Sequence, residues 1–420
     1  MNFERHGRRV VVTGMGVVAP NGRDLTTFWQ TVRDGVSAAG PVTRFDSSAL
    51  PSKIAAEVRD FDCSGYIDLK RAKRFDRSIQ YALVAAVQAV RDARVDVGQL
   101  DPDRVGVVEA TSLSGMESAF RGQTDYETKG YRRLSPFYLI NAYSGSGSGE
   151  ISVELGIKGH AITYSSGSAS GNDAVGYAFN MIRSDEADVM VVGGAEAPLL
   201  PPLYAGFCVG RLLSCRNDDP PGAMRPFDQA RDGLLLGEGA AFLVLEEMSF
   251  ALGRGARVYA EILGHARSCE AYHSVAPHPD GVGIRRAMEK ALRDARLHCS
   301  EVDYINAHGT ATETNDTVET LAVKRLFGEH ARRVAISSTK PVTGHLLAAA
   351  GALETVICVL AIAHQEIPPT INLTAPAAGC DLDYVPQKSR PYPVRVAMNL
   401  NSGFGGKNSS LILREFASAV

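Results

Sequence analysis

Two almost wholly apolar helical segments, each directly after a turn of small residues, constrain the fold of this 420-residue chain most strongly. The sequence predicts the first helix over 172–183 and the second over 345–363. A helix that is apolar on nearly all sides has to be buried in a large core. Because strand patterns alternate with helix patterns on both sides of residue 255, we expect an α/β fold with buried, largely parallel strands.

The corresponding positions of these two helices indicate an internal duplication, although residue identity between the halves is low. We expect an N-terminal half over 1–255 and a C-terminal half over 256–420. No Pro/Ser-rich linker separates the two halves, so they are expected to share one interface.

Composition excludes several classes of function. A hydrophobic content of 45% predicts a soluble globular protein, and a formal net charge of −3 gives no support for nucleic-acid binding. The sequence has no stretch of eighteen uninterrupted apolar residues and no signal-peptide pattern at its start. We therefore expect a cytoplasmic protein without a membrane segment. The 7 cysteines are scattered without a Cys-x-x-Cys pair, which argues against a disulfide framework or a metal site.

The first strand is predicted over 8–13 and is followed by TGMGVVAP, which we interpret as a turn. This turn resembles a dinucleotide-binding loop only superficially. Position 19 is alanine where that motif has its third glycine, and no helix pattern begins there. We therefore expect no nucleotide cofactor.

A compact basic run, Lys70, Arg71, Lys73 and Arg74, precedes a helical pattern over 75–93. It is consistent with an ordinary solvated start of a helix. The alternative is a docking patch for an acidic partner, because opposite charge favours such an encounter.

Ser168 lies in a turn of small residues, SGSASG, at the start of the first apolar helix. A nucleophile there gains from the helix dipole and from unpaired backbone N–H groups, which stabilise a developing anion. The simpler alternative is that Ser168 is the helix N-cap, the commonest use of serine at such a position.

A second candidate motif, NAHGTAT, follows the strand predicted over 302–305 and contains His308, Thr310 and Thr312. A histidine at the end of a strand, beside two hydroxyl groups, is well placed to face a cleft. A lone histidine of this kind is more often a satisfied core residue.

A third motif, SSTKPVTGH, places Lys340 five residues before His345, which we predict to start the second apolar helix. The helix dipole would keep that histidine neutral. Glu354 could pair with Lys340 inside the core. Near the end of the chain, Phe404 lies in the glycine-rich segment NSGFGG, either a hinge around one aromatic or an ordinary turn.

Together these blocks resemble β-ketoacyl-acyl-carrier-protein synthases of the elongating type and the ketosynthase subunits of type II polyketide synthases. The resemblance covers essentially all 420 residues, from VVVTGMGVVAPNG to NSGFGG. It implies a thiolase fold, a five-layered αβαβα sandwich. It also implies an acyltransferase that condenses an acyl chain with malonyl carrier protein, using no bound cofactor and a substrate delivered on phosphopantetheine.

The resemblance assigns roles to individual residues. Ser168 aligns with the cysteine that accepts the acyl chain. His308 and His345 match the pair that binds the malonyl thioester and promotes decarboxylation, supported by Lys340 and Glu354. The remaining assignments are Thr310 and Thr312 to the pantetheine arm, Phe404 to a gate whose N–H completes the oxyanion hole, and Met116 to the wall of an acyl tunnel over 111–120.

A serine at this position leads us to expect slow or absent condensation with retained decarboxylation, because an alcohol is a much weaker acid than a thiol and needs a general base. Three interpretations stay open. The serine is a deliberate inactivating or trapping substitution, it is a natural variant acting as an acyltransferase or slow synthase, or the chain is a non-catalytic partner of the chain-length-factor type.

The resemblance also implies partners. It predicts a dimer, which is either a homodimer or a heterodimer with a chain-length-factor-like subunit. It further predicts binding of an acidic acyl carrier protein, for which Lys70, Arg71, Lys73 and Arg74 are the candidate docking residues.

Overall fold

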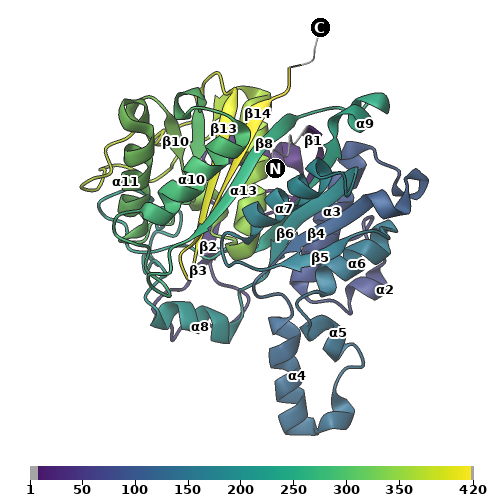
Figure 1. Cartoon of the computed structure of the whole chain (residues 1–420). Helices are drawn as coiled ribbons and strands as arrows, with labels where there is room; N and C mark the ends of the chain where they lie inside the picture. Colours follow the sequence, from purple (N-terminus) through teal and green to yellow (C-terminus); the bar gives the residue numbers. More distant parts are fainter. Residues whose placement is uncertain (1–7, 418–420) are drawn as a thin grey trace.

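The computed structural model describes residues 8–417 and contains ten strands in one hydrogen-bonded array (Figure 1). Three residue pairs between β1 and β8 join two five-stranded halves. The first half has the order β5 (Ala161–Tyr164), β4 (Val105–Ala110), β6 (Val189–Glu196), β7 (Gly239–Glu247), β1 (Val10–Val18). The second has the order β8 (Ala260–Cys269), β14 (Lys407–Glu415), β13 (Val396–Gly403), β9 (Tyr304–Asn306), β10 (Ala335–Ser337).

Helices form three layers around these two sheets. The two apolar helices, α7 (Ser170–Arg183) and α13 (Ala350–His364), pack against each other and against strands of both halves. Helices α3 (Arg77–Ala93) and α6 (Ser146–Leu155) cover the outer face of the first sheet, and α10 (Val282–Ala295) and α11 (Asn315–Phe327) that of the second. The predicted five-layered sandwich with two buried central helices is confirmed.

Shorter elements complete the chain. The remaining helices are α1 (Leu25–Arg33), α2 (Leu69–Ala72), α4 (Met116–Lys129), α5 (Tyr138–Ala142), α8 (Pro201–Val209), α9 (Met248–Gly253) and α12 (Lys340–Thr343). Two small antiparallel sheets pair β2 (Ala39–Pro41) with β3 (Ile54–Ala56) and β11 (Glu366–Ile367) with β12 (Arg390–Pro391). Helices α4 and α5 form an arm that projects from the body of the molecule (Figure 1).

The first strand continues through the glycine segment that we interpreted as a turn. Strand β1 extends to Val18, because Gly14 and Gly16 let α3 pack directly against its backbone. A Cβ atom on Gly16 would lie 2.1 Å from the Ala85 carbonyl oxygen of α3. These glycines serve helix packing.

The strands are mixed in direction, so the prediction of largely parallel strands is wrong. In the first half β4 pairs in parallel with β5 and β6, whereas β7 is antiparallel to β6 and β1. In the second half β13 is parallel to β9 but is joined to β14 by a tight connection over 404–406. Such a short connection allows only antiparallel pairing.

The second apolar helix begins later than predicted. Gly344 (φ 76°) and Leu347 (φ 49°) interrupt the helical path, so α13 starts at Ala350 and His345 lies in the turn before it. Among the described residues, the segment 347–364 is long and apolar enough to cross a membrane by length and composition alone. However, 89% of this segment is buried inside the fold. It is a core helix.

Candidate active site

The turn that carries Ser168 is held by its neighbours. Ser170 Oγ accepts a hydrogen bond from the Ser166 N–H (2.7 Å) and donates one to the Gly167 carbonyl (2.6 Å). Ser166 Oγ donates to Asp173 in the first turn of α7 (2.6 Å). Residue 169 occupies the N-cap position without a side-chain cap. The capping interpretation of Ser168 is therefore wrong, and its side chain is available for other contacts.

The hydroxyl of Ser168 instead contacts a histidine from the other half of the molecule. Ser168 Oγ lies 3.0 Å from His345 Nε2. Ser168 is half-buried, whereas His345 is almost wholly buried. A histidine at hydrogen-bond distance is the partner that a hydroxyl nucleophile requires.

The end of strand β13 approaches the same turn. A Cβ atom on Gly403 would lie 3.0 Å from the Ser168 nitrogen, and one on Gly167 would lie 3.7 Å from the Phe404 nitrogen. The absence of side chains at both glycines lets these two backbone segments meet. The Phe404 ring is half exposed above them, at 51%.

His308 completes the group on the side of strand β9. Its ring centroid lies 5.4 Å from that of His345, with the planes nearly perpendicular. Burial first, and then the charge of Lys340, hold the pKa of both histidines well below the usual 6.5. Both imidazoles are therefore neutral at pH 7, and each carries a single N–H. The late start of α13 means that burial and Lys340, not the helix dipole, keep His345 neutral.

Lys340 and Glu354 form the buried ion pair that the sequence predicts. Lys340 Nζ donates to Glu354 Oε1 at 2.5 Å, and Asn401 Nδ2 donates to the other carboxylate oxygen at 2.6 Å. Burial raises the pKa of Glu354, while the Lys340 ammonium opposes that rise. Removing either partner would leave an uncompensated charge in the core.

Glu319 of α11 is a functional residue that the sequence analysis missed. Its carboxylate accepts hydrogen bonds from the backbone N–H groups of His308 (2.7 Å) and Gly309 (2.9 Å), and burial raises its pKa to about 7. Gly309 (φ 39°) and Ala311 (φ 60°) turn sharply after β9, which leaves N–H groups without strand partners. The need to satisfy those groups was the signal that could have identified Glu319.

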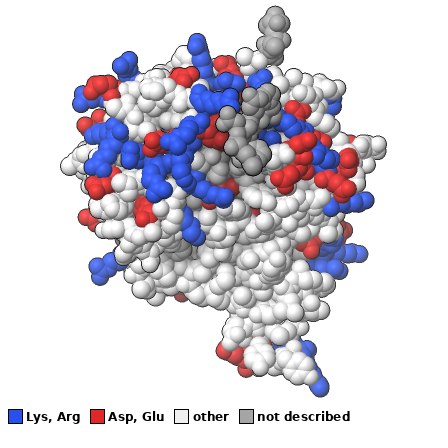
Figure 2. Space-filling view, in the orientation of Figure 1, with Lys and Arg blue, Asp and Glu red and all other residues white. Residues whose placement is uncertain are grey.

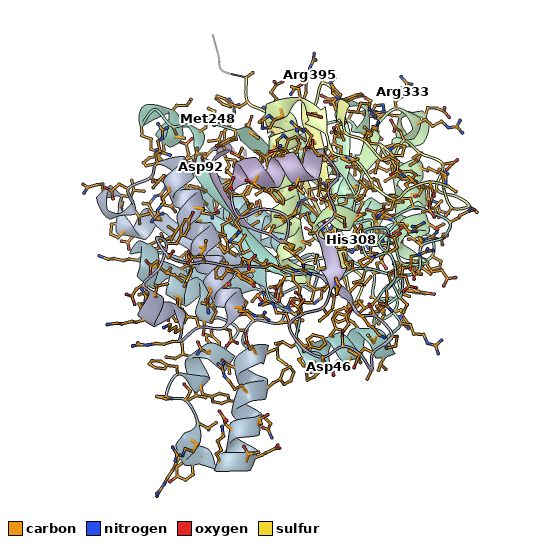
Figure 3. The ribbon with its side chains drawn as sticks, turned by 180° about the vertical axis from the view of Figure 1, so that it is seen from behind. Asp46, Asp92, Met248, His308, Arg333 and Arg395 are labelled. Carbon is orange, nitrogen blue, oxygen red and sulfur yellow. The ribbon has the colours of Figure 1, made fainter. Side chains whose placement is uncertain are left out.

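These side chains open into one cavity of about 180 Å³. Its lining includes six of the predicted site residues: Ser168, His308, His345, Thr310, Thr312 and Phe404. The hydroxyls of Thr310 and Thr312 lie 2.9 Å apart on its wall. Seen from behind, His308 lies inside the body of the molecule and far from the α4–α5 arm (Figure 3).

Met116 does not line this cavity. It is the first residue of α4, one of the two helices of the projecting arm. Its assignment to an acyl tunnel stays a prediction.

The basic run lies on and after α2 and divides into two parts. Arg71 is paired with Glu150 (3.0 Å) and Glu154 (2.6 Å) of α6. Lys70, Lys73 and Arg74 are exposed, and within residues 8–417 none of them has an ion-pair partner. On the face shown in Figure 2, basic side chains gather more densely over α10 than near α2.

The geometry sets the chemistry of the site. A hydroxyl at a helix N-terminus, two neutral imidazoles and the close approach of the 403–404 backbone to the Ser168 turn suit transfer of an acyl group through an oxyanion. Set between the two halves of a five-layered α/β sandwich, they define the class of thiolase-fold acyltransferases.

Comparison with known proteins narrows this class. The model of the β-ketoacyl synthase N-terminal domain matches residues 7–251, and that of the C-terminal domain matches 259–374. The chain belongs to the β-ketoacyl synthase family.

Similar sequences agree with this family assignment. The chain is 45% identical to 3-oxoacyl-[acyl-carrier-protein] synthase 2 of Synechocystis sp. over 99% of both chains. It is 44% identical to the enzyme of the same name from Coxiella burnetii, over 97% of this chain and 98% of that one.

Two solved structures cover 98% of this chain and 100% of their own. One is the ishigamide ketosynthase/chain length factor (TM-score 0.91, 35% identity). The other is a type II PKS acyl-carrier protein in complex with its ketosynthase bound to the hexaketide (TM-score 0.90, 34% identity).

Proposed function

We propose that this site belongs to a β-ketoacyl-acyl-carrier-protein synthase of fatty acid or type II polyketide biosynthesis, in which Ser168 stands at the position of the acyl-accepting cysteine. The observation that carries the proposal is the 3.0 Å contact between Ser168 Oγ and His345 Nε2, with His308 in the same cavity. The reaction is a decarboxylative condensation of an acyl chain with malonyl carrier protein.

The histidines serve the decarboxylation step. As neutral N–H donors, His308 and His345 bind the thioester carbonyl oxygen of the malonyl group. The bond between the carboxylate and the α-carbon then breaks, carbon dioxide leaves, and its electron pair forms an enolate whose oxygen these donors hold. The charge of Lys340 adds to burial in keeping the imidazoles neutral, and Glu354 pairs with that lysine.

Serine weakens the acyl-transfer step. A thiol of pKa about 8.5 becomes largely thiolate at a helix N-terminus, whereas an alcohol keeps its proton until a base removes it. His345 would have to take that proton and also present an N–H to the malonyl thioester. We therefore expect decarboxylation to persist and condensation to be slow, as an inactivating or trapping substitution would produce.

A natural serine acyltransferase is the second candidate, and the Ser168–His345 contact favours it, because a neutral histidine is a competent base. The chain-length-factor alternative is less consistent with the site. His308, Lys340 and His345 are all retained and arranged around one cavity, which a non-catalytic partner does not need.

Mass spectrometry of the protein after incubation with an acyl carrier thioester tests the proposal. A slowly formed acyl adduct on Ser168 supports it, and a rapid, complete adduct favours the acyltransferase. Copurification with a second ketosynthase-like chain, together with no decarboxylation of malonyl carrier protein, would identify a chain-length partner and overturn the proposal.

We further propose an acyl carrier protein as partner, docking on Lys70, Lys73 and Arg74 with Arg71 holding the run in place, and a homodimer or heterodimer as the assembly. Thr310 and Thr312 would contact the pantetheine arm, Phe404 would gate the cavity and Met116 would line the acyl tunnel. The division into halves at residue 255 and a cytoplasmic location also stay predictions.

A further inference from the structure

The turn over 166–171 that carries Ser168 is tied to a carboxylate that the reaction described above does not use. Asp173 lies in the first turn of α7, and its Oδ2 accepts the hydrogen bond of 2.6 Å from Ser166 Oγ. Ser166 precedes Ser168 by two residues, so Asp173 holds the segment that presents the acyl acceptor. The Asp173 side chain is only 5% exposed, and water therefore screens its charge weakly.

His265 of β8 lies on the other side of this carboxylate. Its Nε2 is 3.4 Å from Asp173 Oδ1 and 3.0 Å from Ser409 Oγ of β14. The imidazole rests against the backbone of α7, because a Cβ atom on Gly176 would lie 2.1 Å from its Cγ and Nδ1 atoms. The His265 side chain is also only 5% exposed. A buried histidine from the second half of the molecule thus reaches the start of the helix that carries the acceptor.

The surroundings of Asp173 keep it ionised. Although burial favours the neutral acid, the contact with His265, and then the hydrogen bond from Ser166, hold the pKa of Asp173 below its usual range. Asp173 is therefore a carboxylate at pH 7. A buried carboxylate without an opposite charge is costly, and the imidazolium form of His265 supplies that opposite charge.

Other charged groups face this pair from the neighbouring elements. The cleft beside His265 is also lined by Arg183 of α7, Arg267 of β8, and Lys290 and Asp294 of α10. The cleft beside Asp173 adds Arg286 of α10, Lys407 of β14 and the phenol of Tyr164 of β5. Arg183 and Asp294 lie 2.9 Å apart and neutralise each other, and Asp294 also accepts the backbone N–H of His265. The remaining cations are exposed and screened by water and salt, so His265 is the buried partner of the carboxylate.

We propose that Asp173 and His265 are a positioning pair for the acyl acceptor, in which the carboxylate holds the Ser168 turn through Ser166 and the protonated histidine cancels its charge next to residue 168. Neither member of the pair lines the cavity that Ser168 shares with the two catalytic histidines. The inference rests on the proposed function, because it takes residue 168 as the group that is acylated.

The histidine is needed because negative charge develops at residue 168 during acyl transfer. A cysteine there reacts as a thiolate, and a serine gains negative charge as a base takes its proton. A nearby carboxylate without a counter-charge repels that charge and raises the pKa of the acceptor, whereas a carboxylate–imidazolium pair carries no net charge. Loss of the imidazolium should therefore slow the reaction of residue 168 below the pKa of the acceptor and leave it unchanged well above that pKa.

The test measures the ionisation of residue 168 in the Ser168→Cys variant, which serves as the parent. Alkylation at residue 168 by iodoacetamide is followed by mass spectrometry of that peptide across a pH series, because only the thiolate reacts. His265→Gln in this background keeps a hydrogen-bonding side chain but cannot carry a charge. We expect its alkylation rate at pH 6.5 to fall at least about threefold, with the rate at pH 9 within about twofold of the parent.

Removal of the carboxylate should reverse this effect. The double variant His265→Gln, Asp173→Asn has no charge to compensate and keeps an acceptor for Ser166, so its rate at pH 6.5 should return to within about twofold of the parent. His160→Phe is the matched control, because His160 packs on the same helix but is hydrogen-bonded to the phenol of Tyr177 (3.2 Å) instead of to a carboxylate. It should leave the pH profile unchanged.

An unchanged profile for His265→Gln would overturn the inference, and so would an equal fall at every pH, which is the mark of a purely structural role. A double variant as slow at pH 6.5 as His265→Gln also contradicts it. If the double variant does not fold, Asp173→Asn alone decides, because a rate at pH 6.5 below about half that of the parent refutes the pair. Failure of octanoyl-N-acetylcysteamine to acylate the parent, which leaves the alkylation comparison intact, counts against the proposed function alone.

Discussion

The two central helices present opposite kinds of active-site structure at their N-termini. Before α7, Ser168 is half-buried, and its turn is held by hydrogen bonds from serine side chains, one of them to Asp173. Before α13, His345 and Lys340 are almost wholly buried, and Lys340 forms an ion pair with Glu354 inside the helix. The first half thus supplies a partly accessible hydroxyl group, while the second half supplies a buried, charged environment around the histidines.

The largest expected effect is the loss of stability when the Lys340–Glu354 ion pair is broken. Lys340→Ala leaves Glu354 charged and unpaired in the core, so the free energy of unfolding should fall by about 3–5 kcal/mol. Urea denaturation measures this change. The double variant Lys340→Met, Glu354→Leu removes both charges and should recover most of the loss. A single variant as stable as the double would show that the pair does not carry a buried charge.

The second-largest expected effect is the fall in decarboxylation rate when His308, a hydrogen-bond donor of the second half, is removed. His308→Ala should lower the decarboxylation rate of malonyl carrier protein by about 10²–10³-fold, the usual effect of removing one oxyanion donor. The release of carbon dioxide measures it. His364→Ala, at the distant end of α13, serves as the control. A rate within twofold of the parent protein would remove His308 from the mechanism.

A smaller effect is expected on the turn before α7. Ser170→Ala removes two buried hydrogen bonds, so the free energy of unfolding should fall by about 1–3 kcal/mol. Thermal denaturation measures it, with Ser184→Ala at the exposed end of α7 as the control. No change beyond that of the control would mean that the turn is held by its backbone alone.

The smallest effect concerns the surface. Reversing Lys73 and Arg74 to Glu should weaken binding of an acidic carrier protein several-fold at low salt, and less at high salt because exposed charges are screened. The matched control reverses Arg286 and Lys290, two exposed cations on α10. Weaker binding in the control but not in the test variant would move the docking site to α10.

The resemblance to a known family predicted the five-layer fold, while local residue patterns predicted the two buried apolar helices and the motifs that contribute most of the site. Apolar periodicity identified α7 and α13, and the motifs around His308, Lys340 and Phe404 identified most of the cavity wall. Strand direction was missed because it depends on connections, such as that over 404–406. The start of α13 was missed because a left-handed conformation at Leu347 has no local sequence signal.

Some buried carboxyl groups were missed for a different reason. Glu319 acts through the backbone N–H groups of the turn that follows β9, and Glu109 of β4 is buried against the first turn of α6. Neither environment is visible along the chain. Contacts between residues remote in sequence therefore limit what can be predicted about this site.

The most direct test of the account is the condensation rate of the Ser168→Cys variant, measured with the decarboxylation rate of the same protein as an internal reference. The account predicts that condensation rises by several orders of magnitude, because a thiolate replaces a protonated alcohol, while decarboxylation stays within a few-fold. No gain in condensation would contradict it, because Ser168 would then not occupy the position of the acyl acceptor.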